Sequence, residues 1–222
     1  MGEGRERIYG RRPVAEAQKG RRRVHRVWSA PGTEAAELTR LAGSPEHQGT
    51  VAEVDPYPYA GAGELLARKG SLLVALDQVQ DPHNLGAICR SAEVAGAAGV
   101  VVPSRRAAAV TPAAAKASAG AVEHLAVARV RNLADWIGEA REAGFWAWGA
   151  DAAAPTPHTE VDLRGGIVLV LGGEGKGLRP RVADACDGLV SIPQRGRIDS
   201  LNVSAAAAVL LFEALRQRGG AP

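Results

Sequence analysis

From residue 72 onward, the sequence alternates short, continuously apolar segments with segments of helical periodicity. The apolar segments lack the polar alternation of a strand that has one face in water. Strands of this kind are buried on both faces, which is typical of a parallel sheet covered by helices. The sequence therefore predicts an α/β fold with a mostly parallel sheet. Predicted strands span 72–76, 100–102, 125–130, 146–150, 167–171 and 190–192, and predicted helices span 85–95, 113–119, 133–143, 180–185 and 205–218.

The first 67 residues have a different pattern, and we expect a separate small unit there. The unit is too short to bury much core by itself. Prolines and glycines after residue 55 mark a connection to the remainder. We therefore predict domains at residues 1–67 and 68–222. Within the first, the predicted helices are 8–18 and 34–42, and the predicted strands are 23–29 and 50–54.

Positive charge is concentrated at the front of the chain. Residues 1–28 hold nine Lys or Arg against three Glu, a balance of +6, so the remainder sums to −3 to give the net +3. A basic segment before a mildly acidic body indicates a face that meets phosphates, and a solvated, partly disordered tail is the alternative from charge alone. The candidate RNA-binding residues are Arg11, Arg12, Arg21, Arg22 and Arg23.

Other features exclude several classes of protein. No apolar run reaches the roughly 18 residues of a membrane span, and no apolar segment follows the charged N-terminus as in a signal peptide. Cys89 and Cys186 are far apart and lack further ligands at metal spacing. We therefore expect reduced, mostly buried thiols in a cytoplasmic protein, and no metal site.

Ligands of parallel α/β sheets bind beyond the carboxyl ends of the strands, and three loops at such ends carry unusual residues. In the first, Asn84 is placed to cap a helix whose apolar stripe begins at Leu85. Arg90 lies about 140° around that helix from Leu85. It therefore faces solvent, a cleft or another subunit, and an ordinary solvated charge is the alternative.

The second loop, LGGEGKGL at 171–178, is rich in glycine, so its backbone can approach a ligand closely. It is not a phosphate-binding P-loop, because Gly177 stands where that motif needs Ser or Thr. The third loop, 192–204, brings Ser200, Asn202 and Ser204 to the start of the last helix. All three are capping residues, and a capped core helix is the alternative interpretation.

Together, the three loops resemble the motifs of the SpoU (TrmH-type) RNA ribose 2′-O-methyltransferases of the SPOUT superfamily. The matching segments are LDQVQDPHNLGAICRSAEVAGAAGVVVP, LVLGGEGKGL and IPQRGRIDSLNVSAAAAVLLFEALRQR. IYGRRPVAEA and HQGTVAEV at the front resemble a small RNA-binding domain akin to ribosomal protein L30e. That domain looks shortened, since only residues 43–46 separate its second helix from HQG.

The resemblance implies a deep trefoil knot in the C-terminal part, S-adenosyl-L-methionine as methyl donor, and a homodimer with shared active sites. It implies that Arg90 activates the target hydroxyl. Because a guanidinium barely deprotonates, a charge clamp is the alternative role for Arg90. The remaining implied catalytic residues are Asn84, Glu174, Ser200 and Asn202, and the implied cofactor-binding residues are Leu171, Gly172, Gly173, Ile192 and Leu201.

The branch of the family with such a front domain methylates a guanosine of large-subunit ribosomal RNA, and this substrate is the expectation. A tRNA enzyme or an antibiotic-resistance enzyme of the same family is an alternative. Two other classes stay open: a Rossmann-type nucleotide enzyme that uses the glycine loop as its fingerprint, and a catalytically silent RNA-binding factor of ribosome assembly.

Overall fold

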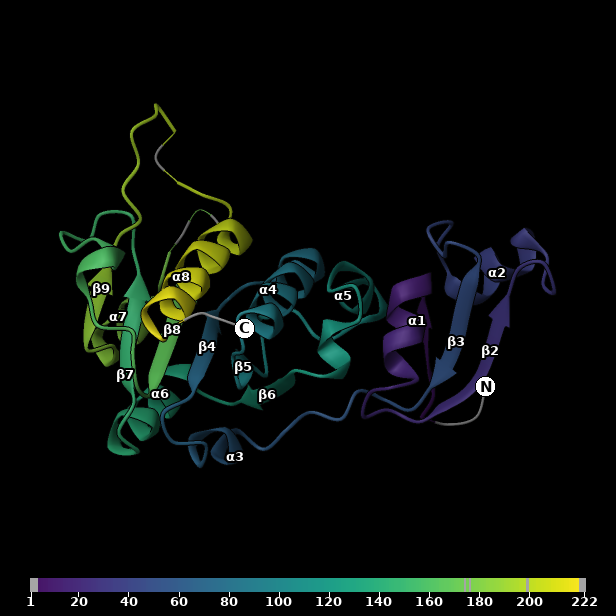
Figure 1. Cartoon of the computed structure of the whole chain (residues 1–222), viewed down its shortest axis with the longest axis horizontal. Helices are drawn as coiled ribbons and strands as arrows, with labels where there is room; N and C mark the ends of the chain where they lie inside the picture. Colours follow the sequence, from purple (N-terminus) through teal and green to yellow (C-terminus); the bar gives the residue numbers. More distant parts are fainter. Residues whose placement is uncertain (1–3, 174, 176, 199, 220–222) are drawn as a thin grey trace.

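The computed structural model describes residues 4–173, 175, 177–198 and 200–219, which form two sheets (Figure 1). The larger sheet has six strands in the order β6-β5-β4-β8-β7-β9, and every pairing in it is parallel. The predicted parallel α/β fold is therefore confirmed. Its strands are β4 (Leu72–Asp77), β5 (Gly99–Pro103), β6 (Ala126–Val130), β7 (Trp146–Ala150), β8 (Ile167–Gly172) and β9 (Gly188–Val190).

Helices cover both faces of this sheet, as the continuously apolar strands require. Along β8, Ile167, Leu169 and Leu171 belong to the core that includes α4 and α8, whereas Val168 and Val170 belong to the core that includes α6 and α7. Successive side chains of this strand point to opposite faces of the sheet and therefore pack into two separate cores. The helices are α4 (Pro82–Val94), α5 (Pro112–Ala117), α6 (Leu133–Glu142), α7 (Pro180–Ala185) and α8 (Val203–Gln217).

The smaller sheet is antiparallel, with the strand order β1-β3-β2, and α1 and α2 pack against it. The prediction of one helix over 8–18 was wrong in its first part. Gly10, at φ 104°, turns the chain between a strand and a helix, a conformation that glycine adopts readily. The elements are β1 (Glu6–Tyr9), α1 (Arg11–Ala17), β2 (Val24–Ser29), α2 (Ala35–Ala42) and β3 (Thr50–Val54).

The connection between the two sheets packs along the larger one. Ala60 forms a bridge with Ala128 of β6, the edge strand. A short helix that the sequence pattern did not predict, α3 (Ala62–Leu66), places Leu65 and Leu66 in the core on the α6 face. The connection is thus attached to the larger sheet and is not a free linker.

Among the helices described, none combines the length and apolarity that crossing a membrane requires.

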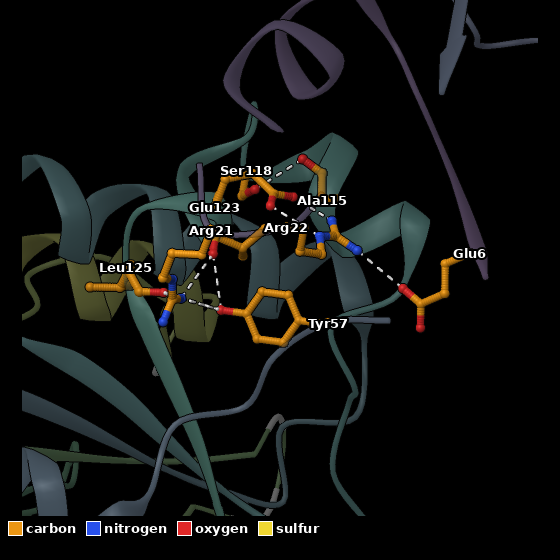
Figure 2. A network of polar contacts seen from close by, with 9 residues as sticks. Glu6, Arg21, Arg22, Tyr57, Ala115, Ser118, Glu123 and Leu125 are labelled. Carbon is orange, nitrogen blue, oxygen red and sulfur yellow. Dashed lines mark hydrogen bonds and ion pairs between the residues drawn. The ribbon is translucent and has the colours of Figure 1, made fainter. Parts of the chain in front are cut away.

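A buried ion pair joins the two parts of the molecule (Figure 2). Arg22, just before β2, and Glu123, just before β6, have side chains that are 1% and 0% exposed. Arg22 Nε donates to Glu123 Oε2 at 3.0 Å, and Arg22 Nη2 donates to Glu123 Oε1. Arg22 Nη1 donates to Glu6 Oε2 at 3.1 Å. Beside it, Arg21 Nη2 donates to the Leu125 carbonyl at 2.6 Å, and the Tyr57 hydroxyl donates to Val122 at 2.9 Å. These contacts fix the small sheet against the large one.

Breaking this pair should cost much stability, because it leaves a charge buried without its partner. We expect Glu123→Gln to lower the free energy of unfolding by about 3–5 kcal/mol in urea. Glu6→Gln is the control. Its side chain is 36% exposed, so the loss should stay within about 1 kcal/mol. An apolar replacement of both partners, Arg22→Met with Glu123→Leu, should recover most of the loss. Equal effects of the Glu123 and Glu6 substitutions would contradict this account.

Candidate functional site

A pocket of about 290 Å³ opens where the carboxyl ends of β4 and β8 meet the start of α8. This is the end of the sheet where ligands of parallel α/β folds bind. Segments far apart in the chain form its wall: the loop after β4 with the first turn of α4, the glycine loop after β8, and the first residue of α8. The lining residues are Gln78, Val79, Gln80, Asp81, Asn84, Gly173, Gly177 and Val203.

The glycine loop packs so tightly that side chains are excluded at two positions. A Cβ on Gly172 would lie 2.1 Å from the carbonyl carbon of Gly177, and a Cβ on Gly173 would lie 2.6 Å from the Gln78 carbonyl oxygen. Gly177 N donates back to the Gly173 carbonyl at 3.2 Å, which closes the loop. The glycines therefore bring the backbone of the β8 loop against the backbone of the β4 loop.

A buried carboxylate anchors the far end of the same loop. The Asp77 side chain is fully buried at the end of β4. It accepts hydrogen bonds from Arg179 N at 2.9 Å and Arg179 Nε at 2.8 Å. Charge-assisted bonds of this kind are about twice as strong as neutral ones. Next to it, Gln78 has a left-handed backbone with φ 60°, which turns its segment toward the pocket.

The two predicted catalytic asparagines meet at the pocket. Asn202 Nδ2 donates to Asn84 Oδ1 at 3.1 Å, although 118 positions separate them. Asn202 also caps α8, as predicted, because its Oδ1 accepts from Ser204 N at 2.8 Å. The predicted capping role of Asn84 was wrong. Asp81 caps α4 through His83 N at 2.9 Å, so Asn84 lies inside the helix and points its amide at Asn202.

Arg90 is exposed on α4, while the predicted apolar stripe of Leu85, Ile88, Cys89 and Ala92 is fully buried. Its position off the stripe is therefore confirmed. Ser200 is also exposed, just before α8. Glu174 lies outside the described residues.

The predicted cofactor-binding residues are spread over this end of the sheet. Gly173 lines the pocket, Gly172 pairs with Asp77, and Leu171 is buried in the core. Ile192 packs against the same core, and Leu201 is 45% exposed. The motifs did not single out six lining residues, namely Gln78, Val79, Gln80, Asp81, Gly177 and Val203. For the first four, the available signal was their place in the loop that follows a buried strand.

The basic front segment is folded, with its residues from Glu6 to Ser29 mostly in β1, α1 and β2. Arg11, Arg12 and Arg23 are exposed. The prediction that Arg22 contacts RNA was wrong, because its guanidinium is buried on Glu123. The Arg21 guanidinium is also engaged within the protein, because it donates to the Leu125 carbonyl and to the Tyr57 hydroxyl.

Both cysteines are free thiols, Cys89 buried and Cys186 partly buried. Burial raises the pKa of each to about 12, so neither is a reactive thiolate near neutral pH. In the described part of the chain, no group of three or more His, Cys, Asp or Glu side chains gathers in an arrangement that suits a metal.

The arrangement of the three loops agrees with comparisons to known proteins. The sequence pattern of the SpoU rRNA Methylase family matches residues 71–212, which contain all three loops and the pocket. The chain belongs to the SpoU rRNA methylase family. The predicted family is therefore confirmed, and membership places the chain among RNA methyltransferases.

Similar SpoU-family proteins extend over nearly the whole chain. A protein of Bacillus subtilis (strain 168) that is assigned to the TrmH family of tRNA/rRNA methyltransferases is 36% identical, and the match covers 98% of each protein. The SpoU methyltransferase AviRb of Streptomyces viridochromogenes, in complex with the cofactor AdoMet, superposes with a TM-score of 0.81 at 29% identity, covering 99% of this chain and 92% of that one. An RNA 2′-O ribose methyltransferase structure gives 0.81 at 26% identity, covering 97% and 89%.

Two glycine substitutions should have effects of opposite sign on this SpoU domain. Gly173→Ala forces the β8 loop away from Gln78 and should destabilise the protein by about 1–3 kcal/mol. Gly138→Ala, in the interior of α6 with open space around the new methyl, should stabilise it by up to about 1 kcal/mol. Urea unfolding measures both. A neutral Gly173→Ala variant would contradict the tight backbone contact.

Proposed function

We propose that the chain transfers a methyl group from S-adenosylmethionine to a ribose 2′-hydroxyl in RNA, and that the target is a guanosine of large-subunit ribosomal RNA. The observation that carries the proposal is the meeting of three distant motifs at one pocket. The β4 loop, the glycine loop and the Asn84–Asn202 pair share the carboxyl end of one sheet. The AdoMet-bound relative and the 2′-O ribose methyltransferase of the same fold support it.

The residues around the pocket suit the donor chemically. When bound, S-adenosylmethionine supplies an electrophilic methyl group on a sulfonium. The glycine loop brings the backbone of Gly173 and Gly177 to the lining of the pocket, and backbone N–H and C=O groups fit the polar edges of an adenosyl group. We assign the adenosyl contacts to Leu171, Gly172, Gly173, Ile192 and Leu201, as in the family motifs, and add Gln78 and Gly177 from the lining of the pocket.

Arg90 is the proposed activating residue, and we assign it the role of a charge clamp. A guanidinium is always charged in proteins, so it is a poor proton acceptor. As a cation, it stabilises the alkoxide that develops when the hydroxyl attacks, or holds the neighbouring phosphate in place. Asn84 and Asn202, with Ser200 and Glu174, position the ribose, since alignment of a poor nucleophile contributes much of the rate.

We further propose a homodimer in which one subunit completes the pocket of the other. Exposed apolar side chains on α4 and α8 support a protein partner on this face, namely Val94, Val209 and Phe212, which are 60%, 38% and 46% exposed. Arg90 projects from the same helix pair. A second copy that covers this face would bring its Arg90 toward a pocket that Arg90 does not line within its own chain.

We also propose that the C-terminal part is knotted. β9 lies at the edge of the sheet beside β7, whereas α8 packs on α4 across β8. The chain between them therefore returns past the carboxyl end of β8, where the glycine loop stands. For the domain organisation, we propose that residues 1–67 recognise RNA, through Arg11, Arg12 and Arg23 among others, and that residues 68–222 catalyse the transfer.

The direct test is to incubate the protein with radiolabelled S-adenosylmethionine and total bacterial RNA, then to map the modified nucleotide. We expect label in large-subunit ribosomal RNA, on a guanosine ribose that resists alkaline cleavage at its 3′ side. Label in tRNA would overturn the assigned substrate and keep the chemistry. Label on a base would overturn 2′-O transfer. RNA binding without any label would identify a silent assembly factor.

Arg90→Ala should retain donor binding and lose methyl transfer, because the side chain lies off the core stripe and acts on the ribose. We expect a fall in kcat of about a hundredfold or more, as for the loss of one charge-stabilising donor, with donor affinity by calorimetry unchanged. Glu93→Ala, also exposed on α4, is the control and should keep wild-type turnover. Wild-type turnover by the Arg90 variant would remove this residue from the active site.

A further inference from the structure

Three exposed arginines stand on the same edge of the large sheet as the pocket. Arg105 and Arg106 follow β5, and Arg131 follows β6. Pro103 pairs with Val130, and Ser104 N donates to the Val130 carbonyl at 2.8 Å, so the two loops leave neighbouring strands side by side. Because all these strands are parallel, their carboxyl ends lie on the edge that holds the pocket.

The first of these loops is tied directly to the wall of the pocket. Ala108 N donates to the carbonyl of Val79, a lining residue, at 2.8 Å. Arg106 has a left-handed backbone with φ 57°, which is uncommon outside glycine and is held here by the flanking contacts. Adjacent strands are about 5 Å apart, so the arginines extend from the pocket over roughly 10 Å across β5 and β6.

The guanidinium groups of these three arginines form no hydrogen bond or ion pair with any residue in the described part of the chain. By contrast, Arg129, which lies in β6 just before Arg131, is engaged within the protein. Its guanidinium stacks on the Tyr59 ring and donates to the Tyr59 hydroxyl at 2.6 Å. Asp135, which shares a groove with Arg131, is paired with Arg181 at 2.7 Å. Glu139, the other acid of that groove, forms no ion pair with Arg131 among the described residues. The three arginines therefore keep their positive charge.

We propose that Arg105, Arg106 and Arg131 form a phosphate-binding row for the RNA strand that flanks the methylated nucleotide. The inference rests on the proposed function, because it supplies the RNA. Arginine binds phosphate through two parallel N–H donors, and free, exposed guanidinium groups beside a ligand pocket match a strand whose charge repeats at every nucleotide. The row lies on the catalytic domain, so it acts in addition to any contact of the N-terminal sheet.

The test is the salt dependence of RNA binding. A triple Arg105→Gln, Arg106→Gln, Arg131→Gln variant is titrated with a short fluorescein-labelled single-stranded RNA between about 50 and 200 mM salt. The plot of log affinity against log salt should be flatter than that of the wild type by about 2, since each lost single-strand phosphate contact removes about 0.7. Donor affinity and the melting temperature should stay unchanged, because the three side chains are exposed and make no described contacts.

The matched control removes the same charge elsewhere. Arg141, Arg164 and Arg216 are exposed, lie outside the proposed RNA-recognising residues 1–67, and are each paired with an acid. Their triple substitution to Gln should leave the slope nearly unchanged. A triple Arg→Lys variant of the row should retain the slope, because lysine keeps the charge.

Equal slopes for the row variant and the control would overturn the proposal, and so would wild-type protein that binds no RNA. A lysine variant that loses the slope would contradict a contact based on charge. These outcomes are separate from the proposed activity, which fails if the wild type binds RNA but transfers no methyl group to any RNA.

Discussion

The close approach of two backbone segments at the carboxyl end of the large sheet determines the rest of the site. Gly172 and Gly173 lie so near the Gly177 and Gln78 backbones that no Cβ fits. This contact joins the two central strands, β4 and β8, beyond their last ladder pair of Asp77 and Gly172. Asp77 then fixes the other end of the loop through Arg179. With the loop held at both ends, its backbone groups are preorganised for a ligand.

The polar side chains of the site depend on the same arrangement. α4 begins four residues after Gln78, and α8 begins where the long segment after β9 returns to the sheet. The Asn84–Asn202 hydrogen bond joins these two helix starts. The N-terminal sheet is held to this body by the buried Arg22–Glu123 pair, and neither residue of the pair lines the pocket.

The sequence predicted the parts of the fold that depend on local pattern. Continuous apolar segments indicated the buried parallel strands, and their ends agree with the structure within about two residues, a usual margin for such boundaries. The β1 strand was missed because Ile8 and Tyr9 continue into a helical pattern, and only the turn at Gly10 separates them. Asn84 was misplaced because Pro82 and Asp81 together start α4 earlier than its apolar stripe does.

Long-range pairing could not be predicted in the same way. Arg22 looked like a member of a basic arm because its partner, Glu123, is 101 positions away, and no local pattern joins them. Asp77 directly follows the predicted strand at 72–76, and its bond to Arg179 spans 102 positions, so no local pattern indicated it. Gln78 and Val203 line the pocket for a similar reason, since three separate segments meet there. The resemblance to the family motifs indicated the chemistry, and the structure showed which residues distant in sequence lie next to one another.

The central proposal is that the methyl donor binds between the β4 loop, the glycine loop and the start of α8. Amide hydrogen exchange with and without S-adenosylmethionine tests this most directly. We expect slower exchange, on binding, at the amides of Gln78, Gly173 and Gly177 and in the first turn of α8, with the N-terminal sheet unchanged. Unaltered exchange at all of these amides under saturating donor, or protection confined to another part of the molecule, would contradict it.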